Sequence, residues 1–216
     1  RDLHKALHSS YTTLFRSLPG LPAQRLSVLQ VRSPAAGAVV PRQRRYRAPV
    51  AIGVYPGTFD PLTVAHLAIA DAAYAHLDIE RLDLAISRAA LGKEHLSTTT
   101  IDRRTDAIVA ATSDRPWLAV VVVDSQLIVD VSVGYDVVVM GADKWAQVLD
   151  PKWYPNARAA HDAVARLPRV AIAPRFGFDV PDELRLTVPG GLEHVSATGV
   201  RAGRLEWAAP TREATS

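Results

Sequence analysis

The amino-acid sequence predicts an α/β fold, in which helices cover both faces of a doubly wound, mostly parallel β-sheet. Short apolar runs alternate with helical patterns from residue 49 onward. Most of these runs are continuous rather than alternating, which is typical of strands covered on both faces. At 216 residues and 48% hydrophobic, the chain can bury a full core. In such a fold, a ligand site is expected outside the carboxyl ends of the strands.

Each expected strand is a short apolar run bounded by polar or turn-forming residues. The six expected strands are residues 50–55, 82–86, 118–123, 137–140, 170–173 and 184–188. The expected helices between them are residues 64–75, 100–112, 125–133 and 156–166. Because strands and helices alternate, right-handed connections and parallel strands follow.

Residues 1–48 differ in composition from the remainder and are expected to form an extension to a domain of residues 49–216. A helical apolar face ends before the helix-breaking pair Pro19 and Gly20, and consists of Leu3, Leu7, Tyr11, Leu14 and Leu18. A stretch rich in arginine and proline follows. Its basic cluster at residues 42–47 could bind an acidic partner or nucleic acid, but low aromatic content favours a solvated linker.

The overall charge and the absence of cysteine exclude several classes of function. Lysine and arginine exceed aspartate and glutamate by 25 to 22, which is too slight an excess to indicate nucleic-acid binding. Without cysteine there is no disulfide framework, thiolate metal site or cysteine nucleophile, which fits a cytoplasmic protein. No run approaches the roughly 18 apolar residues of a membrane span. We therefore expect neither nucleic acid nor a membrane as partner.

The junction between the first strand and the first helix of this domain is the strongest candidate for a functional site. Pro56 and Gly57 end the strand, and His66 falls in the first turn of the helix. Free backbone N–H groups and the helix dipole favour an anion there, and an imidazole can add a directed hydrogen bond. The junction therefore suggests phosphate binding, although a simple connector with an incidental histidine would have the same spacing.

Residues 55–67, Tyr-Pro-Gly-Thr-Phe-Asp-Pro-Leu-Thr-Val-Ala-His-Leu, resemble the signature of the nucleotidylyltransferase superfamily, Gly-x-Phe-Asp-Pro-x-(His/Thr)-x-Gly-His. The resemblance implies a Rossmann-like domain that transfers a nucleotidyl group from a nucleoside triphosphate to a phosphate-bearing acceptor and releases pyrophosphate. Ala65 stands where the family carries glycine. Glycine usually permits close approach of a ligand or backbone, so this difference bears on activity more than on fold.

A second motif occurs about 130 residues later. Residues 195–201, Val-Ser-Ala-Thr-Gly-Val-Arg, resemble the superfamily's late Ile-Ser-Ser-Thr-x-x-Arg motif, with Ala197 in place of the middle serine. Taken alone, Ser196 would be a helix cap. In the order that the family uses, Ser196, Thr198 and Arg201 are instead expected to hold the β- and γ-phosphates of the nucleotide.

Two further segments indicate a branch of the superfamily. Gly141 and Asp143 belong to a Gly-Ala-Asp element, and residues 151–154, Pro-Lys-Trp-Tyr, follow it, as in nicotinate/nicotinamide mononucleotide adenylyltransferases, where the first element contacts adenosine. A strand-ending turn and core tryptophans would also explain them. Thr63 and residues 124–130 resemble phosphopantetheine adenylyltransferase instead, but that family's arginine-bearing loop is absent. The acceptor therefore stays open between the two, with the mononucleotides, and hence NAD biosynthesis, favoured.

The resemblance implies a role for each candidate site residue. His66 would donate to the α- or β-phosphate, Thr63 would contact a neighbouring oxygen, and the backbone of Gly57, Thr58 and Phe59 would contact the nucleotide. Lys93 could bind a phosphate or be an ordinary solvated lysine. ATP is the expected nucleotide substrate, and Mg²⁺ would be held by phosphates and water, with no metal-ligating side chains. A homo-oligomer is possible. A non-catalytic nucleotide-binding member, or an interaction domain that binds no nucleotide, are the alternatives.

Overall fold

The computed structural model describes residues 51–88 and 97–210. The predicted amphipathic helix and basic linker of residues 1–48 lie outside these residues, so the predicted division at residue 49 stays a prediction. In the described part, no helix is long and apolar enough to cross a membrane.

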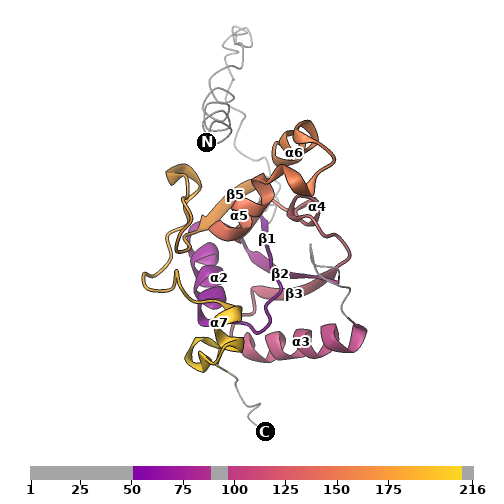
Figure 1. Cartoon of the computed structure of the whole chain (residues 1–216). Coiled ribbons are helices and arrows are strands. Elements are labelled where there is room, and N and C mark those ends of the chain that lie inside the picture. The colour runs from indigo at the N-terminus through magenta and orange to yellow at the C-terminus, as the bar shows by residue number, and fades with distance from the viewer. Residues whose placement is uncertain (1–50, 89–96, 211–216) are drawn as a thin grey trace, which may run out of the picture. The chain divides into compact units, whose positions relative to one another are not determined.

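Within residues 51–88 and 97–210, five parallel strands form one sheet in the order β3-β2-β1-β4-β5 (Figure 1). The strands are β1 (Ile52–Pro56), β2 (Arg81–Ser87), β3 (Leu118–Val123), β4 (Val137–Gly141) and β5 (Arg169–Ala173). The first three strands run from the centre to one edge, and the chain then crosses back to build the other half. This order confirms the Rossmann-like, doubly wound α/β fold.

Helices cover both faces of the sheet. The helices are α2 (Val64–His76), α3 (Thr98–Ala111), α4 (Ile128–Val131), α5 (Ala142–Leu149), α6 (Ala157–Val164) and α7 (Ala197–Arg201), with 3₁₀ turns η1 (Pro151–Trp153), η2 (Asp182–Leu184) and η3 (Leu205–Trp207). One apolar core joins α2 and α3 to the sheet, and a second joins α4, α5 and α6 to its other face. Alternate residues of each strand point into each core, which explains the continuous apolar runs.

The predicted sixth strand at residues 184–188 is wrong. Within this segment, only Arg185 forms a bridge to β5, with Ile172. The 3₁₀ turn η2 ends at Leu184, directly before Arg185. Leu186 nevertheless donates to the carbonyl of Ile172 at 2.8 Å and is 2% exposed. The segment is apolar because it packs on the core. The segment lies between Pro181 and Pro189, which lack a backbone N–H donor, and its single bridge does not extend into a ladder.

Two helices differ from the sequence-based expectation. The helix expected over 125–133 is one turn, Ile128–Val131. Conversely, α5 follows β4 directly and was not expected, because the Gly-Ala-Asp element was interpreted as a loop. Helix α5 begins at Ala142 with Gly141 as its N-cap, so the element is the start of a helix. Its first turn therefore lies at the carboxyl end of the sheet.

Candidate nucleotide-binding site

The loop between β1 and α2 folds tightly over the carboxyl end of the sheet. The backbone N–H of Gly57 donates to the carbonyl of Ala85 at the end of β2, at 3.0 Å. The ring of Phe59, which is 1% exposed, turns back over Gly57. A Cβ at Gly57 would lie 2.6 Å from that ring. Glycine is therefore required here by the loop's own packing.

Reciprocal hydrogen bonds between Thr63 and His66 form a capping box at the start of α2. The Thr63 hydroxyl accepts from the backbone N–H of His66 at 3.3 Å, and Nδ1 of His66 accepts from the backbone N–H of Thr63 at 3.1 Å. Because Nδ1 is an acceptor, the ring proton of neutral His66 resides on Nε2. His66 therefore offers an N–H donor at the start of the helix.

The surroundings of His66 keep the ring neutral. Edge-on contacts to Phe59 and Tyr55 place their ring centroids 5.1 and 6.1 Å from that of His66. Burial, assisted by the positive charge of Arg175, lowers the pKa of His66 to about 4. At pH 7 the ring is an uncharged, directed donor. Such a donor suits a phosphate oxygen without requiring a buried cation.

Thr63 differs from the sequence-based expectation that its hydroxyl contacts a phosphate. Its side chain is 0% exposed, and the hydroxyl lies 3.0 Å from Nδ1 of His66. The structure thus encloses this hydroxyl behind the histidine. Thr63 is placed to orient His66 rather than to contact a ligand.

Arg104 of α3 holds the loop in shape from the side. Its guanidinium donates to the carbonyl of Thr58 at 3.1 Å and lies 3.0 Å from the carboxylate of Asp60. The side chain of Arg104 is only 9% exposed. Arg104 was not among the expected site residues, because its place at the start of a helix is as consistent with a structural role as with a catalytic one.

The late motif lies against the first one. Ser196 caps α7 by accepting from the backbone N–H of Gly199 at 3.0 Å. Arg201, at the end of α7, donates to the backbone carbonyl of Asp60 and to the hydroxyl of Thr198. Figure 1 shows α7 beside the start of α2. Two motifs far apart in the sequence therefore form one surface.

The segment after α7 strengthens this contact. Ala208 forms an antiparallel bridge with Thr63, and the N–H of Ala209 donates to the carbonyl of Leu62 at 2.9 Å. Gly199 packs under the ring of Trp207, with which any added Cβ would collide. The start of α2 is thus held in place by the end of the domain.

Arg175, just after β5, connects a third loop to the site. Its guanidinium donates to the carbonyl of Val195 and lies 3.6 Å from the carboxylate of Asp143, in the first turn of α5. Sequence analysis did not select Arg175, because no motif contains it. It links the Gly-Ala-Asp element after β4 to the late motif.

A family model described as cytidylyltransferase-like matches residues 54–202, which include both motifs. The chain belongs to the cytidylyltransferase-like family. Membership of this family supports nucleotidyl transfer as the general class of activity. A comparison with curated proteins gives no match.

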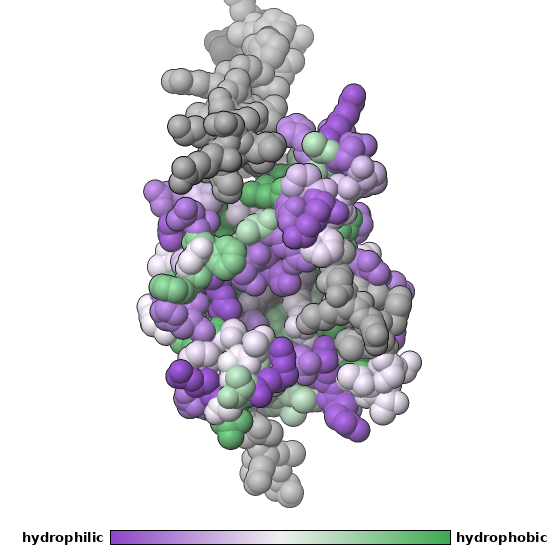
Figure 2. Space-filling model, viewed as in Figure 1, coloured by the Kyte–Doolittle hydropathy of each residue, from purple (hydrophilic) through white to green (hydrophobic). Residues whose placement is uncertain are grey.

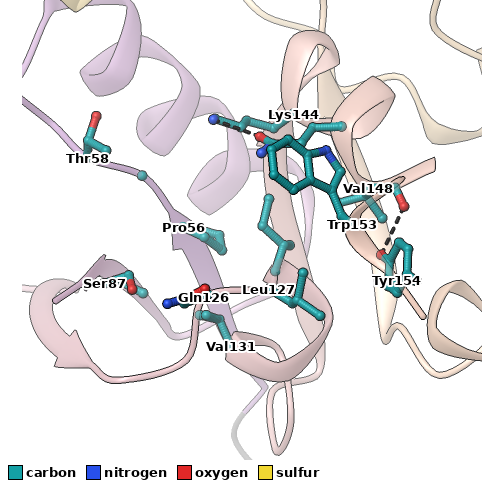
Figure 3. A pocket seen from close by; sticks show the side chains of 14 residues that line it. Pro56, Thr58, Ser87, Gln126, Leu127, Val131, Lys144, Val148, Trp153 and Tyr154 are labelled. Atoms are coloured by element: carbon teal, nitrogen blue, oxygen red, sulfur yellow. Dashed lines mark hydrogen bonds between the residues drawn. The ribbon is translucent and has the colours of Figure 1, made fainter. Parts of the chain in front are cut away.

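The larger pocket of this cytidylyltransferase-like domain opens between β1, β2, α4 and α5 at the carboxyl end of the sheet (Figure 3). Its wall combines apolar and aromatic side chains with a few polar ones. The lining residues are Pro56, Gly57, Thr58, Ala85, Ser87, Gln126, Leu127, Ile128, Val131, Lys144, Gln147, Val148, Trp153 and Tyr154. Figure 2 shows mostly hydrophilic side chains around a hollow at the centre of one face. Such a pocket suits an organic molecule with polar groups.

A smaller pocket lies between α2 and the loop after β5, and it shares no lining residue with the larger one. Ala65, Ala173, Arg175 and Leu192 are among its lining residues. Ala65 is 2% exposed, so its methyl group forms part of the floor where the family signature has glycine. The small pocket is therefore shallower here than a glycine would leave it.

The predicted site residues of this family member divide into groups. The contacts described above bring Thr58, His66, Thr198 and Arg201 together, with Ser196 as the cap of α7 and Thr63 buried behind His66. Gly141 and Asp143 join them through Arg175, while Phe59 is buried as the support of His66. Lys93 lies outside the described residues, so its role stays a prediction.

Proposed function

We propose that the chain is an adenylyltransferase that moves AMP from ATP to a phosphate-bearing acceptor, with nicotinate or nicotinamide mononucleotide favoured. The observation that carries the proposal is the contact between the two motifs. Arg201 of the late motif donates to the carbonyl of Asp60, which lies four residues before the start of the helix that bears His66. A neutral N–H donor and a guanidinium on one surface match the charge of a triphosphate.

The reaction needs no covalent enzyme intermediate. A phosphate oxygen of the acceptor attacks the α-phosphorus of ATP in line, and the bond from that phosphorus to the bridging oxygen of the β-phosphate breaks. Pyrophosphate leaves with the bonding electron pair. In this proposal, His66 donates to the α- or β-phosphate, and Arg201 with Thr198 holds the distal phosphates. Catalysis then consists of positioning and charge stabilisation.

We assign the two substrates to separate pockets. The resemblance assigns adenosine to the Gly141–Asp143 region, and Arg175, ion-paired to Asp143 at 3.6 Å, lines the smaller pocket. We therefore assign the nucleoside of ATP to that side. The larger pocket, with Trp153 in its wall, takes the acceptor.

Mg²⁺ would supply charge neutralisation between the phosphates of ATP. The described residues contain no group of three His, Asp or Glu side chains that could hold a metal ion. We propose that the phosphates of ATP and water would coordinate Mg²⁺.

Pyrophosphate release tests the proposal directly. The protein is incubated with Mg²⁺ and either ATP or CTP, in combination with nicotinate mononucleotide, nicotinamide mononucleotide or 4′-phosphopantetheine. We expect release with ATP and one of the two mononucleotides. Release with 4′-phosphopantetheine alone would move the chain to the competing branch, and release with CTP alone would reject adenylyl transfer. Binding of ATP without release would favour a non-catalytic member.

Replacement of His66 tests the assignment within the reaction. His66→Ala should lower kcat by about 10²- to 10³-fold, as removal of a transition-state donor does in other enzymes. Circular dichroism of the variant should stay that of the folded protein. Turnover within a few-fold of the wild type would reject His66 as the phosphate donor.

A further inference from the structure

Lys144 has an environment that the two motifs do not explain. It is the only charged side chain among the described residues that line the larger pocket. Its ammonium donates to the side-chain carbonyl of Gln147 at 2.9 Å. The described lining contains no carboxylate, so the partner of this cation is a neutral amide.

An ammonium group in this setting has unused capacity for an anion. It carries three N–H donors, and Gln147 accepts one of them. A partly buried cation has lost part of its hydration. When its neighbours are neutral, an anion that enters stabilises the cation through a charged hydrogen bond. Lys144 also lies in the first turn of α5, where the helix dipole favours an anion nearby.

The position of Lys144 indicates which anion this is. Figure 3 shows its amino group extending from α5 toward the side of the pocket formed by Thr58. Thr58 belongs to the loop that Arg104 contacts at the carbonyl of Thr58 and the carboxylate of Asp60, and that Arg201 contacts at the carbonyl of Asp60. An anion between Lys144 and Thr58 would thus lie where the acceptor pocket borders the proposed triphosphate surface.

We propose that Lys144 binds the phosphate of the acceptor and holds it for attack on ATP. This inference rests on the proposed function and deepens it. The remainder of the acceptor lies deeper in the pocket, against Trp153 and the apolar residues of α4. Lys144 neutralises part of the charge of the incoming phosphate, which otherwise repels the triphosphate.

Kinetics with separate variation of ATP and acceptor test this role. Lys144→Met should raise the KM of the mononucleotide by about 10- to 100-fold, the range for loss of a charged hydrogen bond, and leave the KM of ATP within a factor of about two. Lys144→Arg should recover most of the loss. Arg158→Met, which removes a positive charge from the exposed surface of α6, is the matched control and should behave as the wild type.

Two results would overturn the inference. One is an unchanged KM for the acceptor in Lys144→Met. The other is an increase in the KM of ATP alone, which would place Lys144 in the nucleotide subsite. If the wild type releases no pyrophosphate with any acceptor, the proposed function fails, and calorimetric titration of the three acceptors then tests Lys144 separately. Binding at least tenfold weaker in Lys144→Met than in wild type would support the subsite, whereas equal binding, or none to either protein, would reject it.

Discussion

The capping box of α2 gives His66 its orientation and fixes which ring nitrogen carries the proton. The backbone N–H of Thr63 donates to Nδ1, which leaves the proton on Nε2, and burial keeps the ring neutral. Burying a charged imidazole costs free energy because the charge loses its hydration, whereas burying a neutral imidazole costs much less. The same residue pair therefore serves the helix and the proposed site.

The lowered pKa of His66 predicts a loss of stability in acid. Its folded pKa is about 4 and its unfolded value about 6.5, so the unfolded chain takes up a proton first as the pH falls. The free energy of unfolding should then decrease between about pH 6.5 and pH 4, by at most about 1.4 kcal/mol per pH unit, and level off below.

Urea denaturation of wild type and His66→Gln at several pH values measures this contribution. The wild type should lose more stability than the variant between about pH 6.5 and pH 4, and the two should run parallel above about pH 7. Parallel curves throughout would show that the histidine is not buried in its neutral form.

The packing of Gly199 under Trp207 predicts a sensitive position in the late motif. Gly199→Ala brings a methyl group into the indole ring and should destabilise the protein by about 1–3 kcal/mol. Gly190→Ala is the matched control, because a Cβ there has nothing within 4 Å. Thermal unfolding compares the two, and an equal effect at both positions would contradict the packing described.

Candidate site residues could be selected from the sequence where a motif contained them. His66, Arg201 and Ser196 could be selected from the sequence, because each has a fixed place in a short pattern. Arg104 and Arg175 could not, because their partners are distant along the chain and become neighbours only in the folded sheet. The burial of Thr63 was likewise invisible, since a threonine at a helix start can face either way.

At the level of elements, the loop between β1 and α2 depends on α3 for its shape. Arg104→Met leaves the carbonyl of Thr58 and the carboxylate of Asp60 without this partner. We expect a loss of about 1–3 kcal/mol in stability and a fall in kcat of tenfold or more, because the loop supports His66.

Two further variants separate loop positioning from charge. Arg103→Met removes the neighbouring exposed arginine of α3 and should change neither quantity. Arg104→Lys should keep the charge near Asp60 but recover only part of kcat, because lysine lacks the planar fork of donors. Full activity in Arg104→Met would show that the loop holds its shape without this arginine.

Strands were the elements best predicted from the sequence, because burial on both faces leaves uninterrupted apolar runs such as Val137–Gly141. The same rule produced the wrong sixth strand at 184–188, where apolar residues pack on the core without pairing. Helix α5 was missed because its first residues carry a motif associated with a loop. An apolar pattern shows that a segment is buried, but it does not show whether the backbone of that segment pairs with a neighbouring strand.

For the whole molecule, the sheet order places the end of β1 next to that of β4, where the chain reverses direction across the sheet. Ligands of doubly wound sheets bind at this point. The fold class therefore followed from the alternation of elements, and the candidate site is the place where such a fold is expected to bind a ligand. The choice of acceptor did not follow, because in our proposal it depends on side chains such as Lys144, whose position in the pocket no sequence pattern predicts.

Because the proposed ATP site joins both motifs, ATP should stabilise the whole domain. At a concentration of 100 times Kd, ATP with Mg²⁺ should add about 2.7 kcal/mol to the free energy of unfolding. Arg201→Met should reduce this gain by weakening ATP binding, whereas Arg158→Met should not. Differential scanning calorimetry measures the effect, and an equal gain in all three proteins would show that Arg201 does not bind ATP.

The bridge between Thr63 and Ala208 has a consequence for synthesis of the protein. Helix α2 and His66 leave the ribosome roughly 140 residues before the strand-like segment that holds the start of that helix. A nascent chain can therefore form most of its sheet while its first motif still lacks this backbone partner. If the chain binds nucleotide as proposed, competence to bind it should arise late, when residues 208 and 209 emerge.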